Sequence, residues 1–157
     1  MWRKAATIEF YTGTFPDSAI RHVSRAGKNG PVQSAEFVLG GQTFKVFNGG
    51  PGFAFSDGIS LFVECENQEA VDTYWDRFVS AGGTPVQCGW IRDHFGLSWQ
   101  IIPRRFIELM NDEDPKMVKA VVEVMMKMVK LDVATSSFAG NSTRLRGSPS
   151  AVGSEWG

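Results

Sequence analysis

The sequence has few of the residues that build metal centres, disulfide frameworks and general-base sites. Its 157 residues include two cysteines, Cys65 and Cys88, and two histidines, His22 and His94. Two cysteines are too few for a disulfide framework, and their spacing matches no zinc motif. We therefore expect reduced thiols and a cytoplasmic location. His94 follows Asp93 in a predicted turn, where adjacent side chains usually point apart, so no catalytic pair is expected there.

The chain also lacks long apolar runs and a strong charge of one sign. Sixteen Lys and Arg stand against 17 Asp and Glu, which gives a formal net charge of −1, and the basic residues are scattered. Without a basic stripe, a nucleic-acid partner is not expected. No apolar run approaches the roughly 18–20 residues that a membrane-spanning helix needs, so no membrane partner is expected either.

A repeated strand pattern is the clearest feature that the sequence does contain. Residues 41–47 (GQTFKVF) match residues 96–102 (GLSWQII) class by class, with glycine first, a hydroxyl third, an aromatic fourth and a long polar residue fifth. Each copy is preceded by an amphipathic helical segment. The pattern indicates two copies of a helix-plus-strands module, with coincidence between two short segments as the alternative.

Periodicity and turn residues predict the order of the elements. Helices are expected over residues 1–13, from the N-cap at 67 to the glycines at 82–83, over 106–110 and over 117–131. Strands are expected over 19–24, 32–39, 43–47, 59–65 and 97–102. The helix over 117–131 is apolar around much of its circumference, which predicts a contact with a second subunit in a homodimer. Residues 136–157 are rich in Ser and Gly and are expected to form a disordered tail.

Several motifs together resemble a known family. They are residues 15–18 (FPDS), 48–51 (NGGP), 88–90 (CGW), 93–100 (DHFGLSWQ) and 131–135 (LDVAT). They resemble the PhnB-like branch of the glyoxalase/bleomycin-resistance (vicinal oxygen chelate) superfamily, often labelled demethylubiquinone methyltransferase-like. The resemblance covers about residues 4–135. It implies an α+β fold of two βαβββ modules whose sheets curve around a cavity, usually in a homodimer.

The resemblance and the residues together predict one domain over residues 1–135. Module one is expected at about 1–50, module two at about 58–103 and a C-terminal helix at about 114–131. The family fold begins with a strand before the first helix, whereas this chain begins almost at the helix. Module one is therefore expected to lack that strand. Either the chain is truncated there, or another segment covers the exposed sheet edge.

Metal-dependent members of this superfamily hold their metal with side chains on the first and last strands of each module. By resemblance, those positions here include Lys45, Ser60 and Gln100. None is a strong ligand for a divalent metal, so no metal ion is expected. No glycine-rich turn from a strand into a helix is present, so S-adenosylmethionine is not expected as a cofactor either.

Strand alternation identifies the side chains that face away from the apolar stripe of each sheet. The predicted ligand-contacting residues are Lys45, Phe47, Ser60, Phe62, Gln100 and Ile102. Trp99 is predicted on the opposite face, beneath a helix. Lys45 either binds an anionic group or extends to solvent.

The sequence alone is compatible with three functions. The first is a metal-free enzyme that acts on a small organic molecule. The second is a non-enzymatic protein that sequesters such a molecule, as resistance proteins of this superfamily do. The third is an interaction protein with a vestigial cavity.

Overall fold

The computed structural model describes residues 4–50 and 54–135, and the fold is α+β. The chain divides into two compact units. Of the described residues, 4–50, 54–59 and 94–97 belong to unit one, and 60–93 and 98–135 belong to unit two. Each unit has its own sheet.

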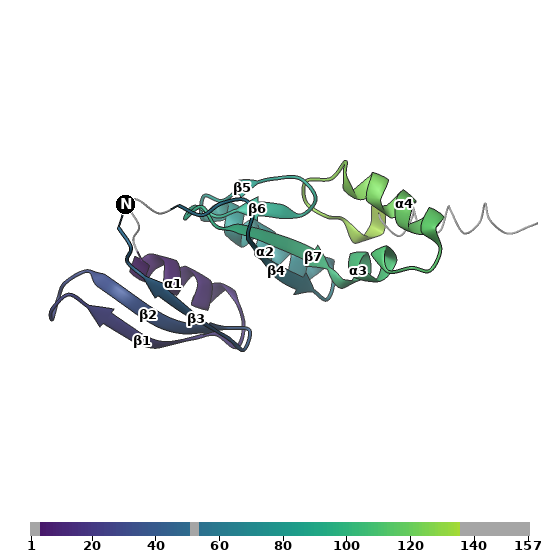
Figure 1. Ribbon diagram of the computed structural model, residues 1–157. Coiled ribbons are helices and arrows are strands. Elements are labelled where there is room, and N and C mark those ends of the chain that lie inside the picture. The colour runs from purple at the N-terminus through teal and green to yellow at the C-terminus, as the bar shows by residue number, and fades with distance from the viewer. Residues whose placement is uncertain (1–3, 51–53, 136–157) are drawn as a thin grey trace, which may run out of the picture. The chain divides into compact units, whose positions relative to one another are not determined.

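Unit one is a helix on a three-stranded antiparallel sheet in the order β1-β2-β3. Its elements are α1 (Lys4–Thr14), β1 (Ala19–Arg25), β2 (Val32–Leu39) and β3 (Gln42–Phe47). Gly40 and Gly41 join β2 to β3 with φ of +51° and +82°, as a two-residue hairpin turn requires. Figure 1 shows α1 lying across one face of this sheet.

The core of unit one forms between α1 and alternate residues of β2. Ala35, Phe37 and Leu39 are buried on the strand, and Ile8 and Tyr11 are buried on the helix. Aromatic rings connect the layers, with the Tyr11 and Phe37 centroids 6.5 Å apart. One face of the sheet therefore packs on the helix, while the alternate residues face the other way.

Unit two has a four-stranded sheet in the order β4-β7-β6-β5, in which β4 is parallel to β7 and the other pairs are antiparallel. Its strands are β4 (Ser60–Cys65), β5 (Thr84–Pro85), β6 (Trp90–Arg92) and β7 (Ser98–Pro103). Its helices are α2 (Gln68–Ser80), α3 (Arg104–Met110) and α4 (Pro115–Met125). In Figure 1, α2 lies along the sheet, and α3 and α4 follow β7.

The helix α2 has clear sequence signals at both ends. The Asn67 side chain accepts a hydrogen bond from the Ala70 backbone N–H at 2.9 Å and so caps the first turn. Gly82, with φ of +90°, ends the helix. Val71, Trp75 and Phe78 are buried on the face toward the sheet. The predicted helix from residue 67 to the glycines at 82–83 is confirmed.

The predicted repeat corresponds to equivalent strands. β3 is the last strand of the α1-β1-β2-β3 run, and β7 is the last strand of the β4-α2-β5-β6-β7 run. β7 has a neighbour on each side, β6 and β4. In the described part of the chain, β3 pairs only with β2. The two βαβββ-like modules are therefore as predicted, and no described residue forms the first strand of module one.

The predicted C-terminal helix over 114–131 is too long, because α4 ends at Met125. Beyond Met125 the chain runs beside the turn that precedes β6. Cys88 N–H donates to Met128 O at 2.9 Å, and Gly89 N–H donates to Val129 O at 2.8 Å. Leu131 is then fully buried with α3 and α4. These tertiary bonds and this burial outweigh the helix propensity of the apolar run.

The predicted tail over 136–157 lies outside the described residues. Among the residues that are described, no helix is long and apolar enough to cross a membrane.

Candidate functional site

The face of the unit two sheet that α2 leaves uncovered carries a row of three side chains across three strands. Phe62 of β4 is the register partner of Gln100 of β7. Trp90 of β6 is the partner of Gln100 on its other side. Directly paired residues point to the same face of a sheet, so the row reads aromatic, amide, aromatic. We call Phe62, Gln100 and Trp90 the aromatic–amide row.

Ser60 orients the amide at the centre of this row. Gln100 Nε2 donates a hydrogen bond to Ser60 Oγ at 2.8 Å, and both side chains are partly buried. Within the described residues this is the hydrogen bond that the Gln100 side chain makes, which leaves its carbonyl oxygen Oε1 and the second N–H of its amide available. A fixed amide with an open acceptor and an open donor can recognise a polar group on a bound molecule.

The two aromatic side chains of the row are accessible. Phe62 is 54% exposed, and Trp90 is half-buried. Within the part of the chain that the structure describes, neither ring contacts another aromatic ring. Two accessible rings on one sheet face add apolar surface to it, and contiguous exposed apolar surface marks binding sites.

The opposite face of the same sheet is covered by α2. Leu61, Ile91 and Trp99 form the matching row there, and the Trp99 ring lies 5.1 Å from that of Phe78 on α2. Trp99 is buried beneath α2, while Gln100 faces away from it. The predicted orientation of this strand is confirmed. A register slip of one residue would have placed Gln100 beneath α2 and Trp99 on the uncovered face.

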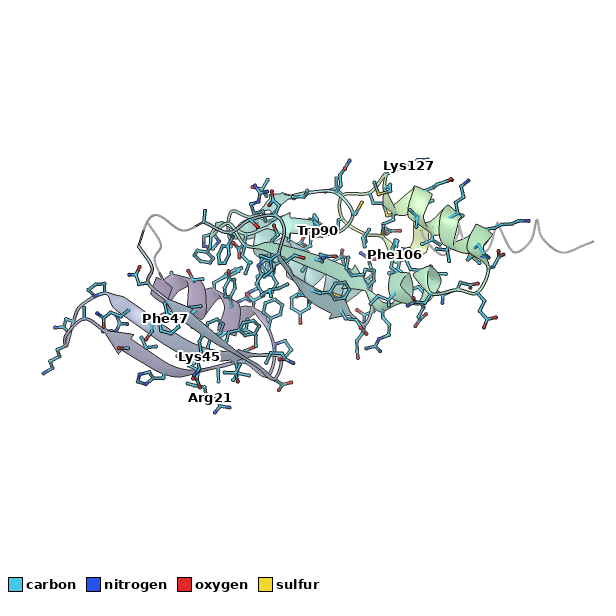
Figure 2. All side chains as sticks on the ribbon, in the orientation of Figure 1. Arg21, Lys45, Phe47, Trp90, Phe106 and Lys127 are labelled. Atoms are coloured by element: carbon cyan, nitrogen blue, oxygen red, sulfur yellow. The ribbon has the colours of Figure 1, made fainter. Side chains whose placement is uncertain are left out.

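The other predicted ligand-contacting residues lie in different surroundings. Lys45 and Phe47 are on β3 of unit one (Figure 2). Lys45 Nζ forms an ion pair with Glu36 Oε2 at 3.2 Å, and Phe47 is 73% exposed. Ile102 packs partly against the apolar cluster of unit two. That cluster consists of Phe106, Leu109, Met117, Val121 and Leu131. A ligand contact for these three residues stays a prediction.

Sequence reasoning missed Trp90 as a member of the candidate site. The sequence does contain a strand signal there, because the side chains of residues 90–92 would alternate between the two faces of a sheet. These residues also precede a turn that leads into β7. Counting back across a hairpin from Gln100 pairs it with Trp90. β6 is only three residues long, however, and such a short strand is hard to recognise from alternation alone.

The residues at the superfamily's metal positions do not fit a divalent metal ion. Ser60 and Gln100 offer neutral oxygens that are already hydrogen-bonded to each other, and Lys45 is a cation paired with Glu36. Among the described residues, no three His, Cys, Asp or Glu side chains gather closely enough to hold a metal ion.

Among the described residues, the turn from β4 into α2 does not have the glycine-rich sequence with which nucleotide-type cofactors are held. The connection from β4 into α2 is Glu66–Asn67, without glycine, and its Asn67 side chain already caps the helix. A glycine-rich strand-to-helix turn is the feature that nucleotide-type cofactors use. The residues present do not fit S-adenosylmethionine, a cofactor of that type.

The chain is similar to one family model and to a solved structure of the same family. The family model described as 3-demethylubiquinone-9 3-methyltransferase matches residues 3–102. A PhnB protein from Bacillus cereus, provisionally named 3-demethylubiquinone-9 3-methyltransferase, is 30% identical with a TM-score of 0.59. The match covers 64% of this chain and 91% of that protein.

Two further solved structures are more distant. A Staphylococcus aureus protein is 25% identical, with a TM-score of 0.27 and coverage of 61% of this chain and 82% of the other. A gene product from Arabidopsis thaliana is 21% identical, with a TM-score of 0.43 and coverage of 62% and 85%. No curated protein is significantly similar to the chain. Because the family match spans more than half of the sequence, this chain belongs to the PhnB-like, 3-demethylubiquinone-9 3-methyltransferase family of glyoxalase-type fold.

Proposed function

We propose that this protein binds a small organic molecule, without a metal ion, on the face of the unit two sheet that α2 leaves uncovered. The observation that carries the proposal is the aromatic–amide row, in which an amide held by Ser60 lies between two accessible rings. Such a combination of apolar area and a few oriented polar groups is typical of small-molecule sites.

We assign binding rather than catalysis to this face. Neither the three side chains of the row nor Ser60 titrates near neutral pH. The nearest carboxylate on the same face of β4 belongs to Glu64, and Arg104 Nε holds it with a hydrogen bond of 2.7 Å. General acid–base catalysis needs a proton-transferring group within reach of the substrate. A sequestering role therefore fits these residues better than a reaction.

Protein-observed NMR of the full chain against a library of small organic fragments tests the proposal. The expected result is a set of fragments that shift the signals of Ser60, Phe62, Trp90 and Gln100 together. Gln100→Ala and Phe62→Ala should each weaken those fragments, while Val79→Ala, an exposed apolar position on α2, should not. Fragments that bind only elsewhere, or no binding at all, would overturn the proposal. Conversion of a bound compound would show that the site is catalytic.

We further infer a homodimer in the cytoplasm, as the sequence predicts. The apolar residues that follow α4 support a subunit contact, because Met126 and Val129 stay about half exposed. Sedimentation at micromolar concentration should give twice the chain mass. Met126→Lys should then shift the equilibrium toward the monomer.

A further inference from the structure

We propose that the ligand of this face is an organic anion. Its apolar body lies on Phe62 and Trp90, and Arg92 binds its oxyanion head group, a carboxylate or a phosphate. The proposal rests on the function proposed above and names the chemical class of the ligand. Two features carry it, the residues that lie beside the aromatic–amide row and the charges on this face of the sheet.

A second row of side chains lies next to the aromatic–amide row. Arg92 of β6 is the register partner of Ser98 of β7 on one side and of Thr84 of β5 on the other. Ser98 is in turn the partner of Ser60 of β4. Arg92 is two residues from Trp90 on the same strand, so both rows occupy the same face. We call Ser60, Ser98, Arg92 and Thr84 the polar row.

The two rows are close enough for one small molecule to contact both. Arg92 is a diagonal neighbour of Gln100, because its own partner Ser98 lies two residues before Gln100 on β7. Such neighbours lie about 7–8 Å apart, within the reach of long side chains. Arg92 and Thr84 are exposed, and Ser60 is partly buried. A molecule on the aromatic–amide row can therefore reach three members of the polar row.

The charge of this face favours an anion. Within the described strands β5, β6 and β7, Arg92 is the one charged residue on the face. The strand β4 adds Glu64, and Arg104 Nε holds that carboxylate at 2.7 Å. Asp93, the residue after Arg92, is buried on the other side of the sheet, where Trp99 donates to it. Because a guanidinium stays protonated at any physiological pH, the face carries a fixed positive charge.

The hydrogen-bond donors on this face also suit an oxyanion. Arg92 has five N–H donors, so it can bind an oxyanion through two parallel bonds in addition to a contact within the chain. Gln100 has a second N–H beyond the one donated to Ser60, and the Thr84 hydroxyl can donate as well. A cationic head group would be repelled by Arg92, and a neutral one would lack the charge-assisted bonds.

The aromatic side chains account for the rest of the ligand. Phe62 is 54% exposed and Trp90 is half-buried, and both are partners of Gln100. An apolar body that covers them removes apolar area from water, which is favourable. A small inorganic anion would leave that area exposed. An organic anion therefore fits the two rows together.

Five compounds separate the contributions of charge and apolar body. 3-Phenylpropanoate, 3-phenylpropanamide and 3-phenylpropylamine carry one ring with a negative, a neutral and a positive head group. Propanoate has the negative head group without the ring, and 2-phenylethyl phosphate has the other oxyanion. Each is titrated into the full chain at low ionic strength, and the side-chain NMR signals of Gln100 and Trp90 report binding at the row.

The anionic compounds with a ring should bind best. 3-Phenylpropanoate should bind about tenfold more tightly than its amide, the effect of a charge-assisted hydrogen bond, and the ratio should fall as salt is added. It should also bind about tenfold or more tightly than propanoate, the effect of the buried ring. The amine should bind most weakly of the phenyl compounds. Whichever of the carboxylate and the phosphate binds more tightly identifies the head group.

Variants assign each preference to its residue. Arg92→Gln should bring 3-phenylpropanoate and its amide to equal affinity, because the charge is gone. Arg92→Lys keeps the charge without the planar fork and should retain part of the preference. Arg77→Gln provides the control, because it removes the same charge from α2 on the other side of the sheet, and it should leave the ratio unchanged. Phe62→Ala should weaken 3-phenylpropanoate but not propanoate. Chemical-shift dispersion confirms that each variant is folded.

The outcomes distinguish this proposal from the one on which it rests. If the amide or the amine binds at the row as tightly as both anionic phenyl compounds, the ligand class is wrong and the binding function stands. A preference for the anion that survives in Arg92→Gln would overturn the role of Arg92. If no compound of this set and no other fragment perturbs the row, both proposals fail.

Discussion

Trp99 donates its indole N–H to Asp93 Oδ2 at 2.9 Å, and both side chains are buried. Asp93 directly follows β6 and Trp99 lies in β7, so the bond ties the two strands of this hairpin together across their turn. Because Trp99 is fixed beneath α2, its neighbour Gln100 must point to the opposite face. The orientation of the candidate site therefore depends on a buried contact that takes no part in it.

Replacing Trp99 with Ala should lower the free energy of unfolding by about 3–5 kcal/mol, as for other large buried aromatics. Trp99→Phe keeps most of the apolar volume but removes the indole donor. It should cost about 1–3 kcal/mol, because the buried Asp93 carboxylate loses a hydrogen-bond partner. Urea denaturation measures both values. Equal losses for the two variants would mean that packing on Phe78 contributes little beyond the hydrogen bond.

Sequence reasoning succeeded where a residue's role depends on its neighbours along the chain. Asn67 and the glycines at 82–83 delimit α2, and alternation alone gives the faces of β7. These features are local, so propensity and periodicity describe them well.

Sequence reasoning was less complete where distant segments meet. The end of α4 at Met125 depends on hydrogen bonds from Cys88 and Gly89, nearly forty residues earlier. Trp90 joins the candidate row only through pairing with Gln100. The contact that ends α4 leaves no periodic signal, because it is set by how remote segments pack, and β6 is too short for its alternation to identify it as a strand.

The bond between Gln100 and Ser60 should show as an energetic coupling. Gln100→Ala and Ser60→Ala are each expected to lower the free energy of unfolding by about 0.5–1.5 kcal/mol, the net contribution of one hydrogen bond. Since both variants remove the same bond, the double variant should cost less than the sum of the two by about 1 kcal/mol. Additive effects in urea denaturation would show that the bond contributes nothing to stability.

The ion pair between Lys130 and Asp72 predicts a pH dependence of stability. Lys130 Nζ lies 2.7 Å from Asp72 Oδ1, and this hydrogen bond, with a second from Gln68, lowers the pKa of the Asp72 carboxyl. A carboxyl group whose pKa is lowered by folding stabilises the folded state at pH values above its ordinary pKa of about 4. This contribution is lost as the pH falls below that value. The bond to Asp72 also raises the pKa of Lys130. The contribution of the charged lysine to stability is therefore lost only at pH values above about 10.

The pair is partly exposed, so Lys130→Met should cost about 0.2–1 kcal/mol at pH 7. At pH 3 the variant and the parent should be closer in stability, because Asp72 is then partly protonated. Lys119→Met, which removes a more exposed lysine 4.0 Å from Glu123, provides the control and should have a smaller effect at pH 7. A cost for Lys130→Met that is the same at both pH values would argue against the ion pair as its cause.

The two cysteines should differ in reactivity. Burial, with a smaller contribution from the charge of Glu64, raises the pKa of the Cys65 thiol to about 11. At pH 8 about one Cys65 in a thousand is then a thiolate, and the side chain is also inaccessible. Cys88 is half-buried, with its Sγ 3.6 Å from Met126 Sδ. Mass spectrometry after iodoacetamide treatment of the native protein should find Cys88 modified first. Equal modification of both residues would indicate that β4 opens readily.

Gly89 should tolerate a methyl group poorly, and Gly27 offers a matched comparison because both have φ of +79°. A Cβ at Gly27 would meet no atom within 4 Å, so Gly27→Ala should cost only the backbone strain of about 1–2 kcal/mol. A Cβ at Gly89 would lie 3.0 Å from Ile101 O, Ile102 Cδ1 and Leu131 Cδ1. Overpacking adds about 1–3 kcal/mol, so Gly89→Ala should cost roughly 2–5 kcal/mol in urea denaturation. The difference between the two variants measures how tightly the segment after α4 is held against the turn before β6. Equal costs would show that this segment moves aside freely, and that the bonds from Cys88 and Gly89 do not fix the end of α4.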